Sequence, residues 1–449
     1  MNGAIQITIP KKLLSLAFML ISALVLVVMG SGGASAISQP QPSATAFKWA
    51  TVQSGASRPY NYLGRLSYDG RYLMFRSNSS LFVPGDTNNS YDVFVKDLQT
   101  GDIQRANVSN SGAQYTDGDN AAAMSPSGRY VTFVHTVSSV DQTYVRDLTN
   151  NTTTLASSDS SGTYANLGST LAVSDNGKVL FFSASHTLPS FISSATPNTY
   201  TFIKDISSGA VSQVPFIDPT GNGDSWQDFE PGTFSGDGNT VVFKAFDSTT
   251  NYRTISGIGN AIGQVVAINI SGNSSVMVTG SYTHNVSQST YYVPIPNGTI
   301  SYDGRYILFA HDRHFLTSSS EATLYLTDTQ TGAISPVDTI PSGRTQNGGV
   351  GVGTLTSISN DGRYVGFVSS ATNLDAIYNP TRYTDSYGNV VGFSLYKRDM
   401  TATNPVMVAN QIVAGANAMY APGSSSFVFD THENIDNADP DSSDLYIAQ

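Results

Sequence analysis

The stretch Ser67-Tyr68-Asp69-Gly70-Arg71-Tyr72-Leu73-Met74-Phe75 decides the fold of this 449-residue chain, because it recurs along nearly the whole sequence. Close copies begin at Ser125, Ser301 and Ser359, and weaker copies begin at Ser174, Ser235 and Ala421. The copies begin between 49 and 66 residues apart, a period that is typical of propeller blades or similar modules. Each copy ends in a phenylalanine, which we expect in the core: Phe75, Phe133, Phe182, Phe243, Phe309, Phe367 and Phe429.

Each copy predicts a β-hairpin. A short strand ends at the serine, Asp-Gly makes a tight turn in which glycine supplies the positive φ, and Arg-Tyr-Leu-Met-Phe alternates as a second strand. A third strand ends in aspartate, as in Asp92–Asp97, and a turn leads to a fourth strand, as in Ile103 to Val108. The same aspartate recurs as Asp147, Asp205, Asp328 and Asp399. With no convincing helical stripe, this pattern predicts an all-β fold of four-stranded blades.

The seventh copy stops after its third strand, Asp444 to Gln449. The N-terminal stretch Ala50 to Gly55 resembles Ala106 to Gly112, which we assign to the fourth strand of the first copy. Pairing the two chain ends would complete the last blade and remove the exposed edges of an open sheet. We therefore predict a seven-bladed β-propeller whose ring is closed by an N-terminal strand.

The unit Ser-x-Asp-Gly-Arg-Tyr-x-x-Phe, followed by Asp92-Val-Phe-Val-Lys-Asp97, resembles the TolB-like, PD40-type (WD40-like) β-propeller repeat of bacterial exported proteins. The resemblance covers residues 47–449 and implies one propeller domain. It does not imply one activity, because that superfamily includes scaffolds, sensors and a few enzymes.

The first 36 residues read as an export signal. Lys11 and Lys12 precede the apolar run Leu13 to Met29, and Ala34-Ser35-Ala36 has the form of a cleavage site. The alternative is an uncleaved anchor, since the run approaches the length that spans a bilayer. A Pro/Ser-rich linker over residues 37–46 leads into the propeller. We expect the protein outside the cytoplasm: extracellular, at the cell surface or in the periplasm.

Composition excludes several classes of function. The chain has no cysteine, so it has no disulfide framework, thiolate metal site or cysteine nucleophile. It carries 22 basic and 33 acidic residues without a basic cluster, which argues against nucleic acid and anionic membrane surfaces as partners. Membrane contact is expected only through the N-terminal segment, if that segment stays uncleaved. We expect a monomer.

The recurring aspartates, such as Asp69, Asp303 and Asp361, are interpreted as structural, because a catalytic acid would break the repeat. Two non-repeating acidic segments are candidate calcium sites, since oxygen-bearing side chains at alternate positions suit a hard cation. The alternative is hydrogen bonds that stabilise the loop. The candidate ligands are Asp86, Asn88 and Asp92, with an echo at Asp439, Asp441 and Asp444. No other cofactor is expected.

Two further clusters are candidate ligand-binding residues on the face that carries the long loops. His311, Asp312, Arg313 and His314 form the densest acid/base cluster, which suits binding of a carboxylate or a sugar or a general acid/base role; the alternative is an ordinary polar loop. Asp224, Trp226 and Asp228 join the third and fourth copies. Trp226 is placed either to stack on a sugar or protein partner or to fill the space between blades.

These observations predict an exported, non-catalytic scaffold that binds a protein or a glycan through its loop-rich face. Variation among the copies is concentrated in the loops of that face, where propellers place binding surfaces. No catalytic residue is assigned, since the sequence has neither Gly-x-Ser-x-Gly nor His-Glu-x-x-His. The alternative function is an extracytoplasmic carbohydrate-active enzyme, a glycoside hydrolase or a polysaccharide lyase.

Overall fold

The computed structural model divides the chain into two units, Met1–Pro40 and Gln41–Gln449, and every strand belongs to the second. The structure describes these residues: 48–49, 61–115, 123–167, 169–182, 201–214, 217, 226–247, 264–278, 300–311, 323–338, 356–375, 392–402, 405–413, 418–420, 427–431 and 444–448. Within them, no helix is long and apolar enough to cross a bilayer. The predicted signal segment and the linker lie outside the described residues.

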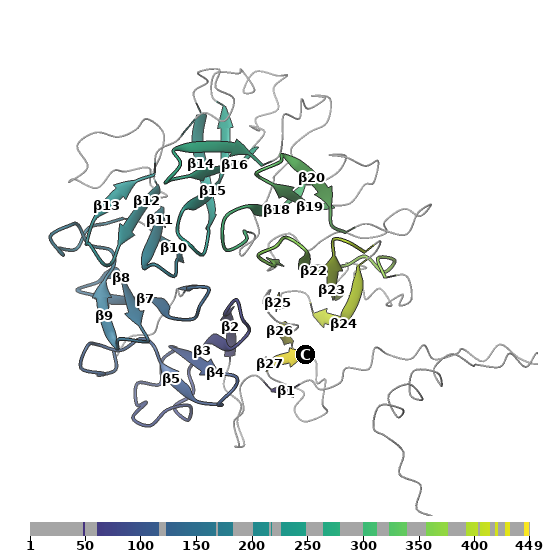
Figure 1. The fold of residues 1–449 in the computed structure, drawn as a ribbon. Coiled ribbons are helices and arrows are strands. Elements are labelled where there is room, and N and C mark those ends of the chain that lie inside the picture. Colours follow the sequence, from purple (N-terminus) through teal and green to yellow (C-terminus); the bar gives the residue numbers. More distant parts are fainter. Residues whose placement is uncertain are drawn as a thin grey trace, which may run out of the picture. The chain divides into compact units, whose positions relative to one another are not determined.

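The strands form seven antiparallel sheets, numbered here in chain order and arranged around a ring (Figure 1). Sheets 1 to 3 are β2 (Asn61–Leu66), β3 (Tyr72–Ser77), β4 (Asp92–Asp97), β5 (Ile103–Arg105); β6 (Ala123–Met124), β7 (Tyr130–Val137), β8 (Val140–Asp147), β9 (Thr152–Leu155); and β10 (Ser169–Val173), β11 (Lys178–Phe182), β12 (Thr201–Asp205), β13 (Val211–Gln213). Sheets 4 and 5 are β14 (Trp226–Phe234), β15 (Thr240–Asp247), β16 (Gln264–Asn269), β17 (Ser274–Met277); and β18 (Tyr306–His311), β19 (Thr323–Asp328), β20 (Ala333–Pro336). Sheets 6 and 7 are β21 (Ser357–Ile358), β22 (Tyr364–Ser369), β23 (Gly392–Asp399), β24 (Val406–Val413); and β25 (Ala418–Tyr420), β26 (Phe427–Thr431), β27 (Asp444–Ala448) with β1 (Lys48–Trp49).

The prediction of an all-β propeller with four-stranded blades is confirmed, but the count of seven such blades is wrong. Six sheets have four strands, and sheet 5 has three. At the place of its first strand, Ile300 makes a single isolated bridge to Ile307, which is too short a pairing to form a strand among the described residues.

The two chain ends pair as expected. Strand β1 lies antiparallel to β27, with Lys48 opposite Ile447 and Trp49 opposite Tyr446. The pairing strand comes just before the predicted Ala50 to Gly55, and β5 likewise ends at Arg105, just before Ala106. The internal likeness therefore located the closing strand correctly and placed it a few residues too late.

Each turn unit, meaning the segment from the serine to the tyrosine, is fixed by its own side chains. In the first unit Ser67 Oγ donates to Asp69 Oδ1 (2.7 Å) and accepts the Tyr72 amide (2.8 Å), and the Arg71 amide donates to Asp69 Oδ1 (3.0 Å). Gly70 has φ +75°. The structural role predicted for the turn aspartates is confirmed, since the units at Ser301 and Ser359 make the same bonds.

The arginine of the unit binds the aspartate that ends the third strand, and we call this pair the Arg–Asp clasp. Arg71 Nη2 lies 2.7 Å from Asp97 Oδ2, and Arg71 Nε lies 3.0 Å from the same oxygen. Asp97 also accepts the Gln99 amide (2.9 Å), which fixes the turn into the fourth strand. The same clasp joins Arg129 to Asp147, Arg305 to Asp328 and Arg363 to Asp399.

Adjacent sheets meet through the tyrosine that follows this arginine. The Arg71 guanidinium lies over the Tyr72 ring, 4.9 Å from its centre. Gly128, in the next turn unit, is so close that a Cβ there would lie 2.7 Å from Cδ2 of Tyr72. Tyr306 and Gly362 repeat this contact between sheets 5 and 6. The glycine is therefore required both by its positive φ and by the neighbouring ring.

The third turn unit is one residue shorter than predicted. The Ser174 amide donates to the oxygen of Lys178, four residues on, whereas the Ser67 amide donates to Tyr72, five residues on. As a result Phe181, not Phe182, takes the fully buried core position and pairs with Phe202, as Phe75 pairs with Phe94. Core positions of Phe75, Phe133, Phe309 and Phe367 are confirmed by exposures of 0–1%.

We expect Gly128→Ala to destabilise the protein more than Gly112→Ala does. Both glycines have φ +79°, but a Cβ at Gly112 meets nothing within 4 Å. Positive φ costs an alanine roughly 1–2 kcal/mol, and overpacking against Tyr72 adds about 1–3 kcal/mol at Gly128 alone. Urea unfolding of the two variants measures the difference. Equal losses would contradict the inter-sheet role of Gly128.

The clasps predict a loss of stability at low pH. The hydrogen bond from Arg305 lowers the pKa of Asp328 to about 2, and Arg363 likewise holds the pKa of Asp399 well below its usual range. A carboxyl whose pKa is depressed on folding stabilises the protein above its unfolded pKa of about 4, and this contribution fades as pH falls through the folded value. We therefore expect wild type to be more stable than Arg305→Gln at pH 6 and the gap to shrink between about pH 4 and pH 2.

Urea unfolding of both proteins across this pH range checks the clasp prediction. Gln330→Ala, in the exposed turn beside Asp328, is a matched control that keeps the ion pair. Its difference in stability from wild type should stay the same across this pH range. A gap that stays constant down to pH 2 would contradict the assignment.

Candidate binding site on the loop-rich face

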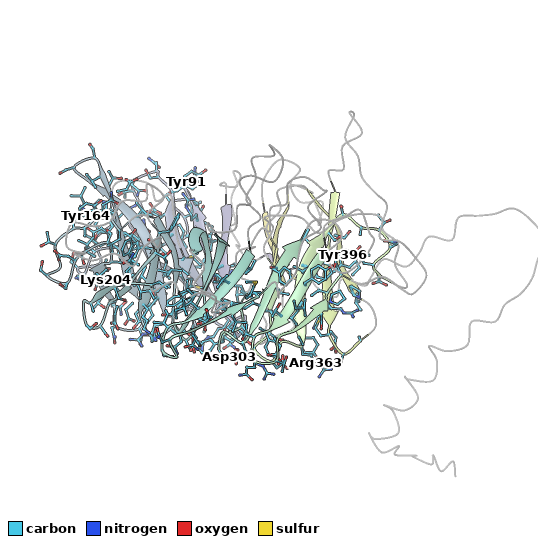
Figure 2. The ribbon with its side chains drawn as sticks, turned by 90° about the horizontal axis from the view of Figure 1, so that it is seen from above. Tyr91, Tyr164, Lys204, Asp303, Arg363 and Tyr396 are labelled. Atoms are coloured by element: carbon cyan, nitrogen blue, oxygen red, sulfur yellow. The ribbon has the colours of Figure 1, made fainter. Side chains whose placement is uncertain are left out.

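The sheets present two different faces. Figure 2 shows Asp303 and Arg363, from turn units, at one edge of the sheets and Tyr91 and Tyr164 at the opposite edge. The first edge is called the turn face. The second is the loop-rich face, where the second strand connects to the third and where the chain passes between sheets. Its described loops include residues 78–91, 106–115, 138–139 and 156–167.

On the loop-rich face of sheet 1 the structure brings together Asp86, Asn88 and Asp92. Asn88 Nδ2 donates to Asp92 Oδ1 (3.4 Å), and the Ser90 amide donates to Asn88 Oδ1 (3.0 Å). Arg105 Nη1 lies 3.1 Å from Asp92 Oδ2 and 3.6 Å from Asp86 Oδ1. The side chains of both acids are at most 3% exposed, so this is a buried ion cluster.

Two further amide side chains donate to the same carboxylate oxygens that Arg105 and Asn88 contact. Gln114 Nε2 donates to Asp86 Oδ1 (3.0 Å) and to Asp92 Oδ2 (3.1 Å), and Asn107 Nδ2 donates to Asp92 Oδ1 (2.6 Å). Burial raises the pKa of Asp92, and this effect is opposed by the Asn107 hydrogen bond and by Arg105. The cluster ties the loop of sheet 1 to the segment that leads into sheet 2.

These oxygens are poorly suited to calcium in this arrangement. A cation beside Asp86 and Asp92 would compete with the Arg105 guanidinium, which already supplies the positive charge. In the part of the chain that the structure describes, no group of three or more His, Asp or Glu side chains is placed to hold a metal ion. The alternative interpretation, loop-stabilising hydrogen bonds, describes what the side chains do here. Calcium binding stays a prediction.

Next to this cluster lies an aromatic patch, defined as Tyr115, His135 and Tyr144. The Tyr115 and His135 rings stack with centres 4.0 Å apart and planes at 29°, and the Tyr115 and Tyr144 centres are 6.0 Å apart. Beneath them Phe133 stacks on Tyr144 at 5.7 Å. Phe133 is buried, whereas the three patch residues are half-buried. The patch therefore continues the core of sheet 2 out to the surface.

The hairpin of β7 and β8 extends the patch toward solvent. Its strands pair Phe133 with Tyr144, His135 with Gln142 and Val137 with Val140. Because side chains alternate along a strand, these six lie on one face of the hairpin. At the tip Val137 is 36% exposed and Val140 is 40% exposed. The result is a stripe that is apolar and aromatic, with the Gln142 amide in its middle.

The other predicted site residues are placed at strand ends or lie outside the described residues. His311 is the last residue of β18, opposite Thr323, while Asp312, Arg313 and His314 lie outside them. Trp226 begins β14, so it belongs to a strand and not to the connecting loop, and Asp228 follows in the same strand. Asp444 begins β27. Asp224, Asp439 and Asp441 lie outside the described residues.

The sequence reasoning missed the aromatic patch. Tyr144 occupies the third-strand position of Phe94, Tyr325 and Tyr396, so it read as an ordinary core residue. His135 follows Phe133 by two residues, which places both on the same face of one strand. That alternation was the available signal. The partner ring of Tyr115 comes from a connecting segment and has no such pattern.

Removal of Arg105 tests the buried cluster. Arg105→Met leaves two carboxylates buried without their cation, which we expect to cost about 3–5 kcal/mol of stability. The matched control is Arg129→Met in a half-exposed clasp, where the loss should be about 1 kcal/mol or less. Urea unfolding gives both values. Melting of the unaltered protein in calcium and in EDTA tests the calcium prediction, and an equal Tm in both would contradict it. An EDTA effect that disappears in Asp92→Asn would instead support a calcium site.

No protein-family model matches the sequence, and no curated protein matches it. In structure, the chain is similar to the β-propeller domain of the Trilobed protease from Pyrococcus furiosus, with 14% identity over 86% of this chain and 93% of that one, and a TM-score of 0.48. It is similar to an oligogalacturonate lyase in complex with manganese, with 14% identity over 87% and 89% of the two chains and a TM-score of 0.47. It is also similar to TolB from Acinetobacter baumannii, with 12% identity over 80% of this chain and 60% of that one, and a TM-score of 0.34. The chain is a β-propeller, and its repeats are consistent with the TolB-like, PD40-type family that they resemble.

Proposed function

We propose that this chain is an exported, non-catalytic propeller that binds a protein or a glycan through its loop-rich face. One observation carries the proposal. The aromatic patch has three half-buried rings, Tyr115, His135 and Tyr144, whereas the corresponding cluster of sheet 1 has one, Phe82, on the buried Phe75 and Phe94. The two faces also differ in which groups they expose: polar side chains bonded to one another on the turn face, and apolar side chains on the loop-rich face.

The turn face offers a partner little to bind. The repeated serine, aspartate and arginine side chains of its turn units already bond to one another, as in Ser301, Asp303 and Arg305. A partner would have to break these bonds and offer equally good ones. By contrast, three of the large hydrophobic side chains that are exposed among the described residues lie on the loop-rich face: Leu81 in a loop, and Val137 and Val140 at the strand ends beside residues 138–139. Exposed apolar groups beside polar ones are typical of binding surfaces.

Export is supported by the N-terminal sequence. A basic pair, Lys11 and Lys12, an apolar run and small residues follow one another in the order of a secretory signal. The chain has no cysteine, so its folding does not depend on the formation of disulfides in an oxidising compartment. The place of action proposed here is therefore the periplasm, the cell surface or the medium.

Charge insertion on the two faces tests the proposal. Val137→Arg places a cation at the loop-rich face, and Gln330→Arg is a matched exposed control on the turn face. We screen the purified protein against immobilised polysaccharides and against envelope protein fractions from its own host, and assay the polysaccharides for new reducing ends. We expect a ligand that Val137→Arg loses and Gln330→Arg keeps, with no products released. Release of products, or a ligand that only Gln330→Arg loses, would overturn the proposal.

A further inference from the structure

The aromatic patch is held in place from below and from the side. Asn88 Nδ2 donates to the backbone oxygen of Tyr115 (3.1 Å), and the preceding residue, Gln114, is bound by the buried cluster of Asp86 and Asp92. Beneath it, Phe133 is 1% exposed and stacks on Tyr144. Binding to a surface that is already ordered loses less conformational freedom, so these contacts favour a recognition role for the rings.

Polar groups lie beside the rings. Tyr144 Oη donates to Gln142 Oε1 (3.1 Å), which leaves the amide N–H groups of Gln142 on the same face as His135. On the opposite face of the hairpin, Thr136 Oγ1 donates to Asp141 Oδ1 (2.7 Å). Aromatic surface with amide and hydroxyl groups at its rim suits a ligand that has an apolar face and hydroxyls around its edge.

Charge narrows the class of ligand. The chain has a net charge of −11, and Asp141 is exposed on the opposite face of the same hairpin. Arg146, a buried cation of the same strand as Tyr144, donates to Thr153 Oγ1 (3.3 Å) and Asn151 Oδ1 (3.1 Å). The acidic group of a uronate or a sulfated sugar would therefore be repelled by the net negative charge of the chain, and no side chain of the patch is a guanidinium that could offset this repulsion. A neutral sugar meets no such repulsion.

We propose that the aromatic patch, with Gln142, is a binding site for a neutral hexopyranose unit of a saccharide. The sugar's C–H face packs against the patch beside the stacked pair of His135 and Tyr115, and its hydroxyls bond to the Gln142 amide. Three rings and two valines are far fewer residues than the roughly 20–30 per partner of a standard protein interface, which favours a small ligand. The inference rests on the proposed function, for which it names the ligand and the site.

Titration of the full-length protein with neutral oligosaccharides tests the proposal. Gluco-, manno- and chito-oligosaccharides are the probes, oligogalacturonate is the charged comparison, and calorimetry measures Kd. We expect at least one neutral probe to bind. His135→Ala and Gln142→Ala should each weaken it about tenfold, since each removes one direct contact. Both side chains lie on the hairpin above the core, and far-UV circular dichroism and Tm verify that the variants are folded.

Tyr164→Ala is the matched control. It removes another half-buried ring of the loop-rich face, one whose pKa is raised by burial and by nearby Asp141 and which lies outside the patch. Its Kd should equal that of wild type. Saccharide binding that His135→Ala leaves unchanged, or a preference for oligogalacturonate, would overturn the site. A protein ligand that Val137→Arg abolishes, with no saccharide bound, would also overturn it while leaving the proposed function intact.

Discussion

The structure depends on a tyrosine ring held between an arginine of its own turn unit and a glycine of the next. Arg71 covers one side of Tyr72 and, on another side, Gly128 approaches so closely that no side chain fits there. Because Arg71 also binds Asp97, one contact region fixes the second strand, the end of the third strand and the neighbouring sheet. The ion pairs are half exposed and each is worth little alone. Their importance lies in orienting the rings.

Six of the turn units then join one another in a closed circle, and the turn of the seventh copy lies outside the described residues. Backbone and side-chain bonds lead from Tyr68 to Pro126, from Ser127 to Asp175 and from Asp175 to Gly236. They continue from Asp237 to Tyr302 and from Asp303 to Asn360, and the Asn360 amide returns to the hydroxyl of Tyr68. Sheets far apart in sequence are thus connected at the turn face. A substitution in one turn acts on its neighbours as well, so this face has little freedom to vary.

Much of this architecture was predictable, since a repeat averages over its copies. The turn glycines have the predicted positive φ, and most motif phenylalanines that can be assessed are buried. The prediction of the core phenylalanine was wrong where one copy departs from the repeat. Ser174 begins a turn that is one residue shorter, so Phe181 and not Phe182 takes the core position. Recurrence also showed that Asp97 is structural without showing its partner. Arg71 is 26 residues away, and spacing alone does not reveal such contacts.

The same limit explains what sequence reasoning found at the loop-rich face. Asp86, Asn88 and Asp92 were correctly grouped because they are neighbours in sequence, but Arg105 and Gln114 reach them from other segments. Replacing a buried ion cluster with apolar groups often costs no stability, so stability is a weak reason for its presence. A better reason for the cluster is that it positions the neighbouring loop. Gln114, which donates to both acids of the cluster, is followed directly by Tyr115. The cluster therefore holds this non-repeating loop in place where the aromatic patch begins.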